Sequence, residues 1–217
     1  FFLKIPIRIS HSHSCYEEKS MLRKIIKKII RYVINRISTH QLACSVDAGK
    51  WLYGKEFLGN GTSFVLKNGI DINKYLFNSQ TRDRIRTQLG IKDKFVIGHV
   101  GTLNRVKNQI FLIKVFKELI SIKPNSHLLL VGTGEDEKKL KEYVEKIGLS
   151  NNVSFLGARE DVYDLMQAMD VFVFPSLYEG LGMVLIEAQA SGLKCVASNN
   201  IPIESNITNS IDLLDLN

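Results

Sequence analysis

The sequence predicts an α/β protein with a doubly wound, Rossmann-like parallel sheet. Short apolar runs typical of buried strands recur along the chain, and segments with helical apolar spacing separate them. Glycine and proline residues stand at many of the boundaries between the two kinds of segment. With 217 residues and 45% hydrophobic content, the chain can bury a core in one or two domains. No apolar run approaches the length that a membrane-spanning helix needs.

Strands and helices alternate from residue 90 onward. The predicted strands are Lys94–Val100, Ser126–Val131, Val153–Leu156, Val171–Phe174 and Lys194–Ser198. The predicted helices are Asn108–Ile122, Asp136–Ile147, Val162–Met169 and a helix that ends near Gly192. This order predicts a parallel sheet whose strands are joined by right-handed crossovers.

The first third of the chain holds fewer elements. The pattern predicts the end of a strand over Ile5–Ser10, a long helix over Met21–Ser38, and a strand, turn and helix over Ala43–Trp51. These pieces are too few to make a compact domain alone. We therefore expect residues 1–68 and residues 69–217 to belong to different domains.

The positive charge of the chain is concentrated near its N-terminus. Of the net charge of +7, residues 1–68 carry +8 and residues 69–217 carry −1. This asymmetry indicates a localised patch, and we expect no nucleic-acid partner. The three cysteines, Cys15, Cys44 and Cys195, are far apart and lack metal-ligand spacing, which favours free thiols and a cytoplasmic location.

The helix predicted over Met21–Ser38 is amphipathic and basic. Two interpretations stay open: a helix that lies on an anionic membrane surface, or a helix packed on a core with its basic face in solvent. The apolar stripe consists of Leu22, Ile25, Ile26, Ile29, Ile30, Val33 and Ile37.

The segment from Val171 to Gly192 is the most informative part of the sequence. It reads as a buried strand, a tight loop with two glycines, and a helix whose N-terminus faces the carboxyl end of the strand. That edge of a parallel sheet is where ligands bind, and the free amides of a helix N-terminus favour an anion. Glu179 in the loop and Glu187 in the helix supply carboxylates for hydroxyl groups. The pattern fits a nucleotide-sugar; two surface glutamates near a helix start are the alternative.

With these residues the sequence resembles the retaining GT-B glycosyltransferases of the group 1 family, and most of all those that build capsular or exopolysaccharide. Glu179 and Glu187, preceded by Pro175-Ser176, match the hallmark of that family. The resemblance implies that residues 1–68 are the C-terminal remainder of the N-terminal acceptor domain with its linker, and that residues 69–217 are the nucleotide-sugar donor-binding domain without its last helices. On this interpretation the chain is a fragment, truncated at both ends. Further matches follow in family order and cover nearly the whole chain. They are His11-Ser12-His13, Ala43-Cys44-Ser45, Asn68-Gly69-Ile70-Asp71, Gly101 with Lys107-Asn108, Val131-Gly132-Thr133-Gly134, and the segment from Val153 to Asp161.

The resemblance implies roles for residues in the two-glutamate segment. Glu179 would contact the transferred sugar, and Glu187 would accept hydrogen bonds from the ribose hydroxyls. Gly180, Leu181 and Gly182 would present backbone amides to the donor diphosphate.

The resemblance also implies roles elsewhere in the chain. Lys107 would stabilise the negative charge of the departing diphosphate, next to Gly101 and Thr102. Leu156 and Arg159, at the ends of the segment 156–159, would line the base pocket. A histidine at the end of the first strand would face the donor sugar; His11 and His13 are both candidates, and His11 is favoured.

One position departs from the family pattern. The family has an arginine where this sequence has Thr102, and Thr102 cannot supply a cation. Arg105 is three residues further on, and the sequence does not reveal its direction.

The expected function is therefore transfer of a hexose or N-acetylhexosamine from a nucleotide-sugar, with uridine diphosphate favoured. The acceptor would be a polysaccharide or a lipid-linked glycan, and the configuration would be retained. No metal or other cofactor is implied, because no Asp-x-Asp-like cluster accompanies the diphosphate residues. An inactive remnant that at most binds the nucleotide, or a sugar-nucleotide epimerase of the same fold, are the alternatives. The expected location is the cytoplasm, with the inner face of the cell membrane as a further contact.

Overall fold

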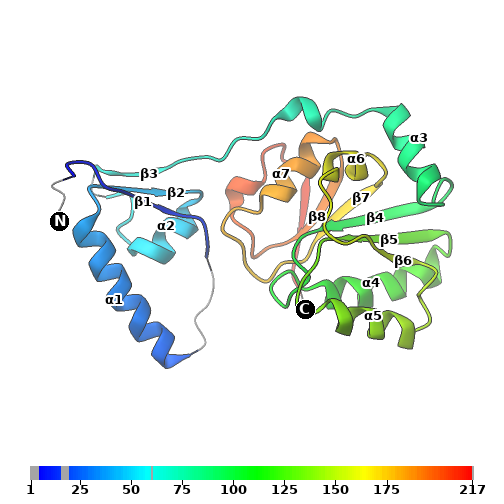
Figure 1. Ribbon diagram of the computed structural model, residues 1–217, viewed down its shortest axis with the longest axis horizontal. Helices are drawn as coiled ribbons and strands as arrows, with labels where there is room; N and C mark the ends of the chain where they lie inside the picture. Colours follow the sequence, from blue (N-terminus) through cyan, green and yellow to red (C-terminus); the bar gives the residue numbers. More distant parts are fainter. Residues whose placement is uncertain (1–4, 16–19, 60, 217) are drawn as a thin grey trace. The chain divides into compact units, whose positions relative to one another are not determined.

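The computed structural model describes residues 5–15, 20–59 and 61–216, and they form two compact units (Figure 1). The first unit comprises Phe1–Gly69 together with two short segments from later in the chain, Tyr178–Gly182 and Ile201–Ser205. The second unit comprises Ile70–Leu177, Met183–Asn200 and Asn206–Asn217.

The second unit is built on a six-stranded parallel sheet with strand order β6-β5-β4-β7-β8-β9. The register aligns Ile97 of β4 with Leu128 of β5 and with Val171 of β7. The five strands that the sequence predicts are confirmed, and β9 is an addition. The strands are β4 (Phe95–Val100), β5 (Ser126–Val131), β6 (Val153–Phe155), β7 (Val171–Phe174), β8 (Lys194–Ser198) and β9 (Ile211–Leu214).

Helices cover both faces of this sheet, as a doubly wound fold requires. Figure 1 shows α4 and α5 on one face and α6 and α7 on the other. The helices are α3 (Ser79–Gln88), α4 (Gln109–Ile122), α5 (Glu137–Lys146), α6 (Val162–Gln167) and α7 (Met183–Ala190), with 3-10 turns at Ile72–Lys74 and Ile203–Ser205. The buried residues between β4, β5, α4 and α5 include Ile97, Leu112, Ile113, Phe116, Leu128, Leu130 and Leu140.

Helix α3 is held by charges and not by an apolar stripe. Its Arg86 is buried, and Arg82 and Arg86 both donate hydrogen bonds to the carboxylate of Asp170, just before β7. The same carboxylate accepts a hydrogen bond of 2.7 Å from the backbone N–H of Val96 in β4. Burial alone would raise the pKa of Asp170, but the Val96 amide and the two guanidinium groups outweigh it and hold this pKa below its ordinary value. The carboxylate therefore ties α3 to the starts of two strands.

The first unit has a three-stranded parallel sheet with the order β1-β2-β3. The strands are β1 (Ile9–Ser12), β2 (His40–Ala43) and β3 (Ser63–Val65), and the helices are α1 (Met21–Ile37) and α2 (Val46–Tyr53). The prediction of a strand over Ile5–Ser10 was wrong in its bounds. Pairing with β2 begins at Ile9, which lies opposite His40, and it continues to Ser12.

Helix α1 is attached to α2 through its polar side. The Arg31 guanidinium donates a hydrogen bond of 2.7 Å to the carbonyl oxygen of Trp51, and the Lys27 ammonium lies 4.1 Å from the centre of the Trp51 ring system. One turn further on, Asn35 Nδ2 donates to the carbonyl oxygen of Tyr53 at 2.9 Å. Positions 27, 31 and 35 are four residues apart, so they share one side of the helix.

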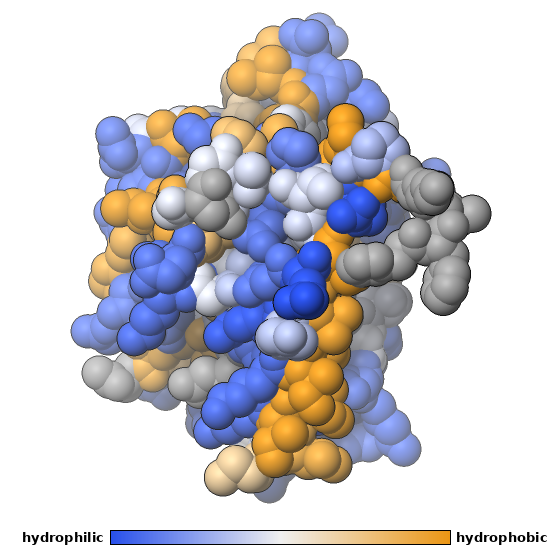
Figure 2. Space-filling model, turned by 90° about the vertical axis from the view of Figure 1, so that its left-hand side faces the viewer, coloured by the Kyte–Doolittle hydropathy of each residue, from blue (hydrophilic) through white to orange (hydrophobic). Residues whose placement is uncertain are grey.

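The apolar stripe of α1 lies on the opposite side of the helix, and it is exposed. No residue of α1 is buried. The view in Figure 2 shows a continuous hydrophobic band next to hydrophilic side chains on the side of the first unit where α1 lies. A helix packed on the core through this stripe, one of the two interpretations of the sequence, is therefore not what the described residues show. The stripe residues Leu22, Ile25, Ile26, Ile29, Ile30, Val33 and Ile37 are between 37% and 66% exposed.

Candidate functional site

The site in the second unit begins where the strand order reverses. Strands β4, β5 and β6 follow one another toward one edge, whereas β7 adds to the other side of β4. In open parallel sheets a crevice forms at this switch point, beyond the carboxyl ends of the strands. The loops after β4 and β7 meet here, because the Leu177 N–H donates to the Val106 carbonyl oxygen at 2.8 Å.

The loop after β4 carries Lys107 at the switch point. The Lys107 ammonium lies 4.7 Å from the centre of the Phe174 ring at the end of β7. Gly101 is a neighbour of this side chain, since a Cβ atom there would stand 3.4 Å from Lys107 Cε, an ordinary van der Waals contact. Thr102 is exposed beside them. A cation held at this crevice suits an anionic ligand group.

Arg105 contacts different neighbours from Lys107. It lines a pocket of about 500 Å³ together with residues at the start of α5, among them Glu135, Asp136 and Lys139. Lys107 does not line this pocket.

The turn after β5 packs directly on the loop after β4. A Cβ atom at Gly132 would stand 2.1 Å from the Gly101 carbonyl oxygen, and one at Gly134 would stand 2.2 Å from the carbonyl oxygen of Leu103. Backbone hydrogen bonds join the same segments, from Gly101 N–H to Val131 and from Leu103 N–H to Thr133, both at 2.9 Å. The glycines of this turn therefore fix the position of the first loop. They are not part of a dinucleotide fingerprint.

The predicted base-pocket segment follows β6. The Leu156 N–H donates to the Leu130 carbonyl oxygen at 2.9 Å, which continues the pairing of β6 with β5. Arg159 makes two hydrogen bonds to Asp161, at 2.7 and 2.6 Å. This hydrogen bonding to Asp161 raises the pKa of Arg159 and lowers that of Asp161. The guanidinium is thus engaged with its neighbour two residues away.

Glu187 is half-buried in α7, and its partner is a tyrosine that the sequence did not single out. Burial raises the pKa of Glu187, and a hydrogen bond from the Tyr75 hydroxyl acts in the opposite direction. Burial, together with the nearby carboxylate, raises the pKa of Tyr75 to about 12. Tyr75 also packs edge-on against Tyr163, with ring centres 6.4 Å apart. No sequence pattern indicated Tyr75, because it lies in an irregular segment far from Glu187 along the chain.

In the first unit, the loop from Tyr178 to Gly182 is fixed by serine hydroxyls. Ser45 Oγ donates to the Gly180 carbonyl oxygen and also accepts a hydrogen bond from the Ala48 N–H at the start of α2. Ser205 Oγ donates to the Leu181 carbonyl oxygen.

The structure explains why two positions of this loop are occupied by glycine. Gly180 must lack a side chain, because a Cβ atom would stand 2.1 Å from the His13 carbonyl oxygen. Gly182 has a φ of 75°, the left-handed conformation that favours glycine. Glu179, just before Gly180 in this loop, is half-buried.

The two candidate histidines also belong to the first unit, and the structure distinguishes them. Their rings lie 4.0 Å apart, His11 within β1 and His13 just beyond it. His13 is exposed, whereas His11 Nε2 is buried without a hydrogen-bond partner in the part of the chain that the structure describes. Burial, with a smaller contribution from His13, lowers the pKa of His11 and keeps its ring neutral. His11 therefore offers a buried nitrogen that a ligand hydroxyl could satisfy.

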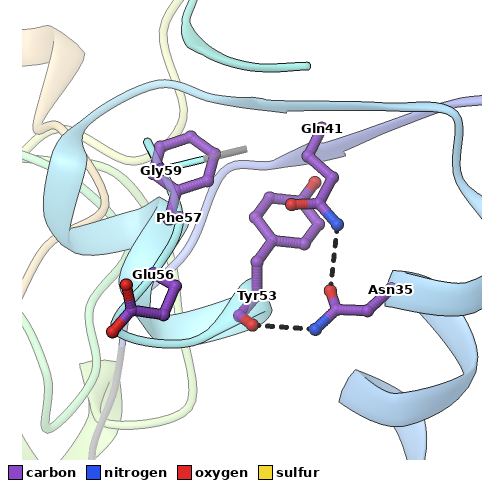
Figure 3. Close-up of a pocket in the computed structure, with 6 residues that line it drawn as sticks. All are labelled: Asn35, Gln41, Tyr53, Glu56, Phe57 and Gly59. Atoms are coloured by element: carbon purple, nitrogen blue, oxygen red, sulfur yellow. Dashed lines mark hydrogen bonds between the residues drawn. The ribbon is translucent and has the colours of Figure 1, made fainter. Parts of the chain in front are cut away.

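A separate pocket of about 270 Å³ lies in the first unit between α1, α2 and β2 (Figure 3). Its amide side chains bond to each other and to the backbone: Gln41 Nε2 donates to Asn35 Oδ1 at 3.1 Å, and Asn35 Nδ2 donates to the Tyr53 carbonyl oxygen. The two amide side chains of this pocket therefore satisfy each other and the backbone.

Within residues 5–15, 20–59 and 61–216, no group of three or more His, Cys, Asp or Glu side chains is placed to hold a metal ion. No helix in the same ranges combines the length and the apolar character that crossing a membrane demands.

Several known proteins resemble this chain in sequence. Residues 81–210 match the family described as glycosyl transferases group 1. A Bacillus subtilis (strain 168) protein named glycosyltransferase EpsF is 37% identical over 203 residues, which cover 91% of this chain and 52% of that protein. The Escherichia coli UDP-Gal:alpha-D-GlcNAc-diphosphoundecaprenol alpha-1,3-galactosyltransferase is 30% identical over 218 residues, which cover 96% of this chain and 56% of that protein.

Solved structures agree with the sequence comparison. Anabaena HepE in complex with UDP and glucose superposes with a TM-score of 0.85 at 25% identity, covering 99% of this chain and 59% of HepE. WaaG, a glycosyltransferase involved in lipopolysaccharide biosynthesis, has a TM-score of 0.77 at 21% identity and covers 95% of this chain and 61% of WaaG, which is a likeness of fold. The chain thus spans about half the length of the relatives it matches.

Proposed function

Because this chain belongs to the glycosyl transferases group 1 family and has the GT-B fold, we propose that it is the donor-binding part of an enzyme that uses a uridine diphosphate sugar. The observation that carries the proposal is the switch point of the parallel sheet, where Lys107 supplies a cation beside Gly101. Support for uridine comes from relatives: HepE was solved with UDP and with UDP-glucose, and the Escherichia coli relative is named for UDP-Gal.

The proposed reaction moves a hexose or N-acetylhexosamine with retention of configuration. The bond between the anomeric carbon and the diphosphate oxygen breaks, UDP leaves, and an acceptor hydroxyl forms the new bond on the same face while losing its proton. Lys107 would stabilise the charge that develops on the leaving diphosphate. Thr102 has no charge to add, so this chain would rely on Lys107 and on backbone amides of Gly180, Leu181 and Gly182.

The remaining sites would bind neutral parts of the donor. Glu187 would accept hydrogen bonds from the ribose hydroxyls. Its carboxylate now accepts a hydrogen bond from the Tyr75 hydroxyl. Leu156 and Arg159 would border the base. Glu179 and His11 would contact the transferred sugar, since His11 Nε2 lacks a partner among the described residues. His13 is exposed and has no such role in the proposal.

The proposed acceptor is a polysaccharide or a lipid-linked glycan at the inner face of the cell membrane. The name of the Escherichia coli relative includes a diphosphoundecaprenol acceptor, and WaaG is described as a glycosyltransferase involved in lipopolysaccharide biosynthesis. An acceptor with a long lipid would remain in the bilayer, so the enzyme would have to work at its surface.

The donor proposal is tested by titrating UDP into the purified chain and following the heat of binding. We expect the wild type to bind UDP and Glu187→Ala to bind it about tenfold more weakly, because a lost charge-assisted hydrogen bond costs about 1.5–3 kcal/mol. Glu142→Ala, an exposed glutamate of α5, serves as the control and should bind like the wild type. Absence of binding by the wild type would refute the donor site; equal binding by Glu187→Ala would refute the ribose role.

We further propose that α1 contacts an anionic lipid surface. Its polar side is already occupied by α2, which leaves the apolar stripe exposed. The helix carries no acidic residue, and its basic residues Arg23, Lys24, Lys28 and Arg36 are exposed in addition to those that contact α2. Apolar and basic side chains together are what an anionic bilayer surface attracts.

Vesicle sedimentation tests the lipid proposal. The chain should sediment with vesicles of phosphatidylcholine and phosphatidylglycerol, and the bound fraction should fall severalfold for Ile25→Ser/Ile29→Ser and at high salt. Ile122→Ser provides the control, since Ile122 is 83% exposed on α4 and should leave binding unchanged. Sedimentation that is equally strong with pure phosphatidylcholine, or absent with both vesicles, would contradict the proposal.

A further inference from the structure

A buried histidine lies beneath the loop that carries Lys107. His99 of β4 is fully buried, with its ring beside those of Phe172 and Phe174 at centre distances of 6.4 and 6.1 Å. Its Nδ1 lies 2.9 Å from the carbonyl oxygen of Val173 in β7. A carbonyl only accepts, so Nδ1 carries the proton, and Nε2 of the neutral ring is left as an acceptor.

The Gln109 side chain donates a hydrogen bond to that acceptor and a second one to the backbone on the other side of the loop. Its Nε2 lies 3.1 Å from His99 Nε2 and donates there, and its second N–H donates to the Thr102 carbonyl oxygen at 2.9 Å. The reversed amide would bring two acceptors together at His99, so the tautomer of His99 sets the orientation of Gln109. Gln109 is 1% exposed, and its hydrogen bond to Thr102 joins residues seven positions apart in the chain.

This loop has the predicted diphosphate residues at its two ends. Gly101 lies between Lys107 and His99: a Cβ atom at Gly101 would stand 3.4 Å from Lys107 Cε and 3.5 Å from His99 Nε2. Asn104 Oδ1 accepts a hydrogen bond of 3.0 Å from the Lys107 N–H, which shapes the other end. The conformation of the loop is therefore held from inside by Gln109 and His99.

The charge state of His99 keeps the arrangement intact. Burial lowers the pKa of His99 to about 4, the bond to Val173 acts against this, and the charge of Lys107 lowers the pKa further. The ring is neutral at every pH at which the protein would work, so Nε2 remains an acceptor for Gln109.

We propose that His99 and Gln109 are positioning residues that hold the loop from Gly101 to Lys107 in the shape that binds the donor diphosphate. Neither side chain would touch the ligand; each acts through the backbone of Thr102 and the placement of Lys107. The proposal rests on the proposed function, because it assigns a cause to the affinity of that same site.

The first test compares UDP affinity with thermal stability in three variants. His99→Phe and Gln109→Met keep the approximate volume and remove the hydrogen bonds, and each should raise the dissociation constant for UDP about tenfold. His127→Phe is the matched control: His127 is also buried with a pKa of about 4, but it bonds Lys94 and Ser154 near the start of β5. It should lose comparable thermal stability and keep the UDP constant within about twofold.

The outcomes separate this inference from the proposed function. No UDP binding by the wild type would overturn the donor site and this inference together. Wild-type binding with equal constants for all variants, or with the same loss in His127→Phe as in His99→Phe, would overturn the positioning role alone.

A second test measures how the dissociation constant for UDP depends on pH, because a loss of stability alone would not produce the expected dependence. Gln109→Glu cannot donate to neutral His99, but its carboxylate raises the pKa of His99, and protonated His99 can donate to it. The ratio of the UDP constant of Gln109→Glu to that of the wild type should therefore fall at least about threefold from pH 8 to pH 6. A ratio that is constant over this range would contradict the proposal, and the wild-type titration accounts for the ionisation of UDP itself.

Discussion

At the scale of single residues, the candidate site depends on glycines, which have no side chain, as much as on charged groups. Gly132 has a φ of 128°, and a Cβ atom there would collide with the Gly101 carbonyl oxygen. Only a residue without a side chain lets the turn after β5 support the loop after β4. The positions of Gly101 and Lys107 therefore depend on a glycine in a neighbouring loop.

This dependence predicts the effect of Gly132→Ala. We expect a loss of about 2–3 kcal/mol in the free energy of unfolding, from backbone strain and displacement of Gly101, and weaker UDP binding as well. Gly148→Ala is the control, because Gly148 also has a positive φ of 73° but nothing lies within 4 Å of its Cβ position. It should cost about 1 kcal/mol and leave UDP binding intact. Urea denaturation gives the stabilities, and equal effects in the two variants would contradict the prediction.

Some residues of the candidate site could be predicted from the sequence, and others could not. Lys107, Glu179 and Glu187 were predicted because motif spacing marks them. Tyr75 and Gln109 were missed, because their roles come from tertiary contacts with no signal in the local sequence. Gln109 in particular reads as an ordinary first residue of a helix.

At the scale of elements, the carboxylate of Asp170 joins α3 to the sheet. Two guanidinium groups and the Val96 amide converge on it, and Arg86 is buried with a side-chain exposure of 7%. Without this carboxylate, the two guanidinium groups would keep hydrogen bonds to backbone carbonyl oxygens but would lose the negative charge that they share.

Asp170→Asn should therefore destabilise the protein by roughly 2–4 kcal/mol at pH 7. Asp164→Asn serves as the control, since its partner Arg84 is 49% exposed in its side chain and an exposed pair contributes at most about 1 kcal/mol. Urea denaturation at neutral pH measures both. Equal stability of Asp170→Asn and the wild type would contradict the role of the carboxylate.

The pH dependence of this contribution has a definite sign. The pKa of Asp170 is lowered in the folded state, so its stabilisation is fully present above the unfolded pKa of about 4 and is lost as the pH falls through the lower folded value. The difference between the wild type and Asp170→Asn should therefore shrink at pH values below about 4. A difference that stays constant to the acid transition would contradict this assignment.

Most elements could be predicted because apolar periodicity marks them, and those that were missed lack it. Helix α3 has the sequence SQTRDRIRTQ, with Ile85 as its only buried apolar residue, so no apolar stripe indicates it. Strand β3 has three residues, and β9 buries only its first residue, Ile211. These elements are held by ion pairs and by edge pairing, which single-sequence patterns do not reveal.

At the scale of the whole molecule, the fold class and the parallel pairing of the strands were predictable, whereas the grouping of distant segments was not. A sequence read from end to end suggests one boundary. The compact units instead take Tyr178–Gly182 and Ile201–Ser205 from the later part of the chain into the first unit. Long-range bonds such as Ser45 to Gly180 and Val46 to Glu204 produce this grouping, and no local pattern announces them.

That grouping limits how the gene can be recombined with those of its relatives. A hybrid joined at the linker near Gly69 would inherit its first strands from one parent and both returning segments from the other. Ser45 and Val46 would then meet residues of the other parent at the positions of Gly180 and Glu204. A hybrid that keeps these hydrogen bonds would therefore need three segments from the same parent, namely residues 1–69 and both short segments.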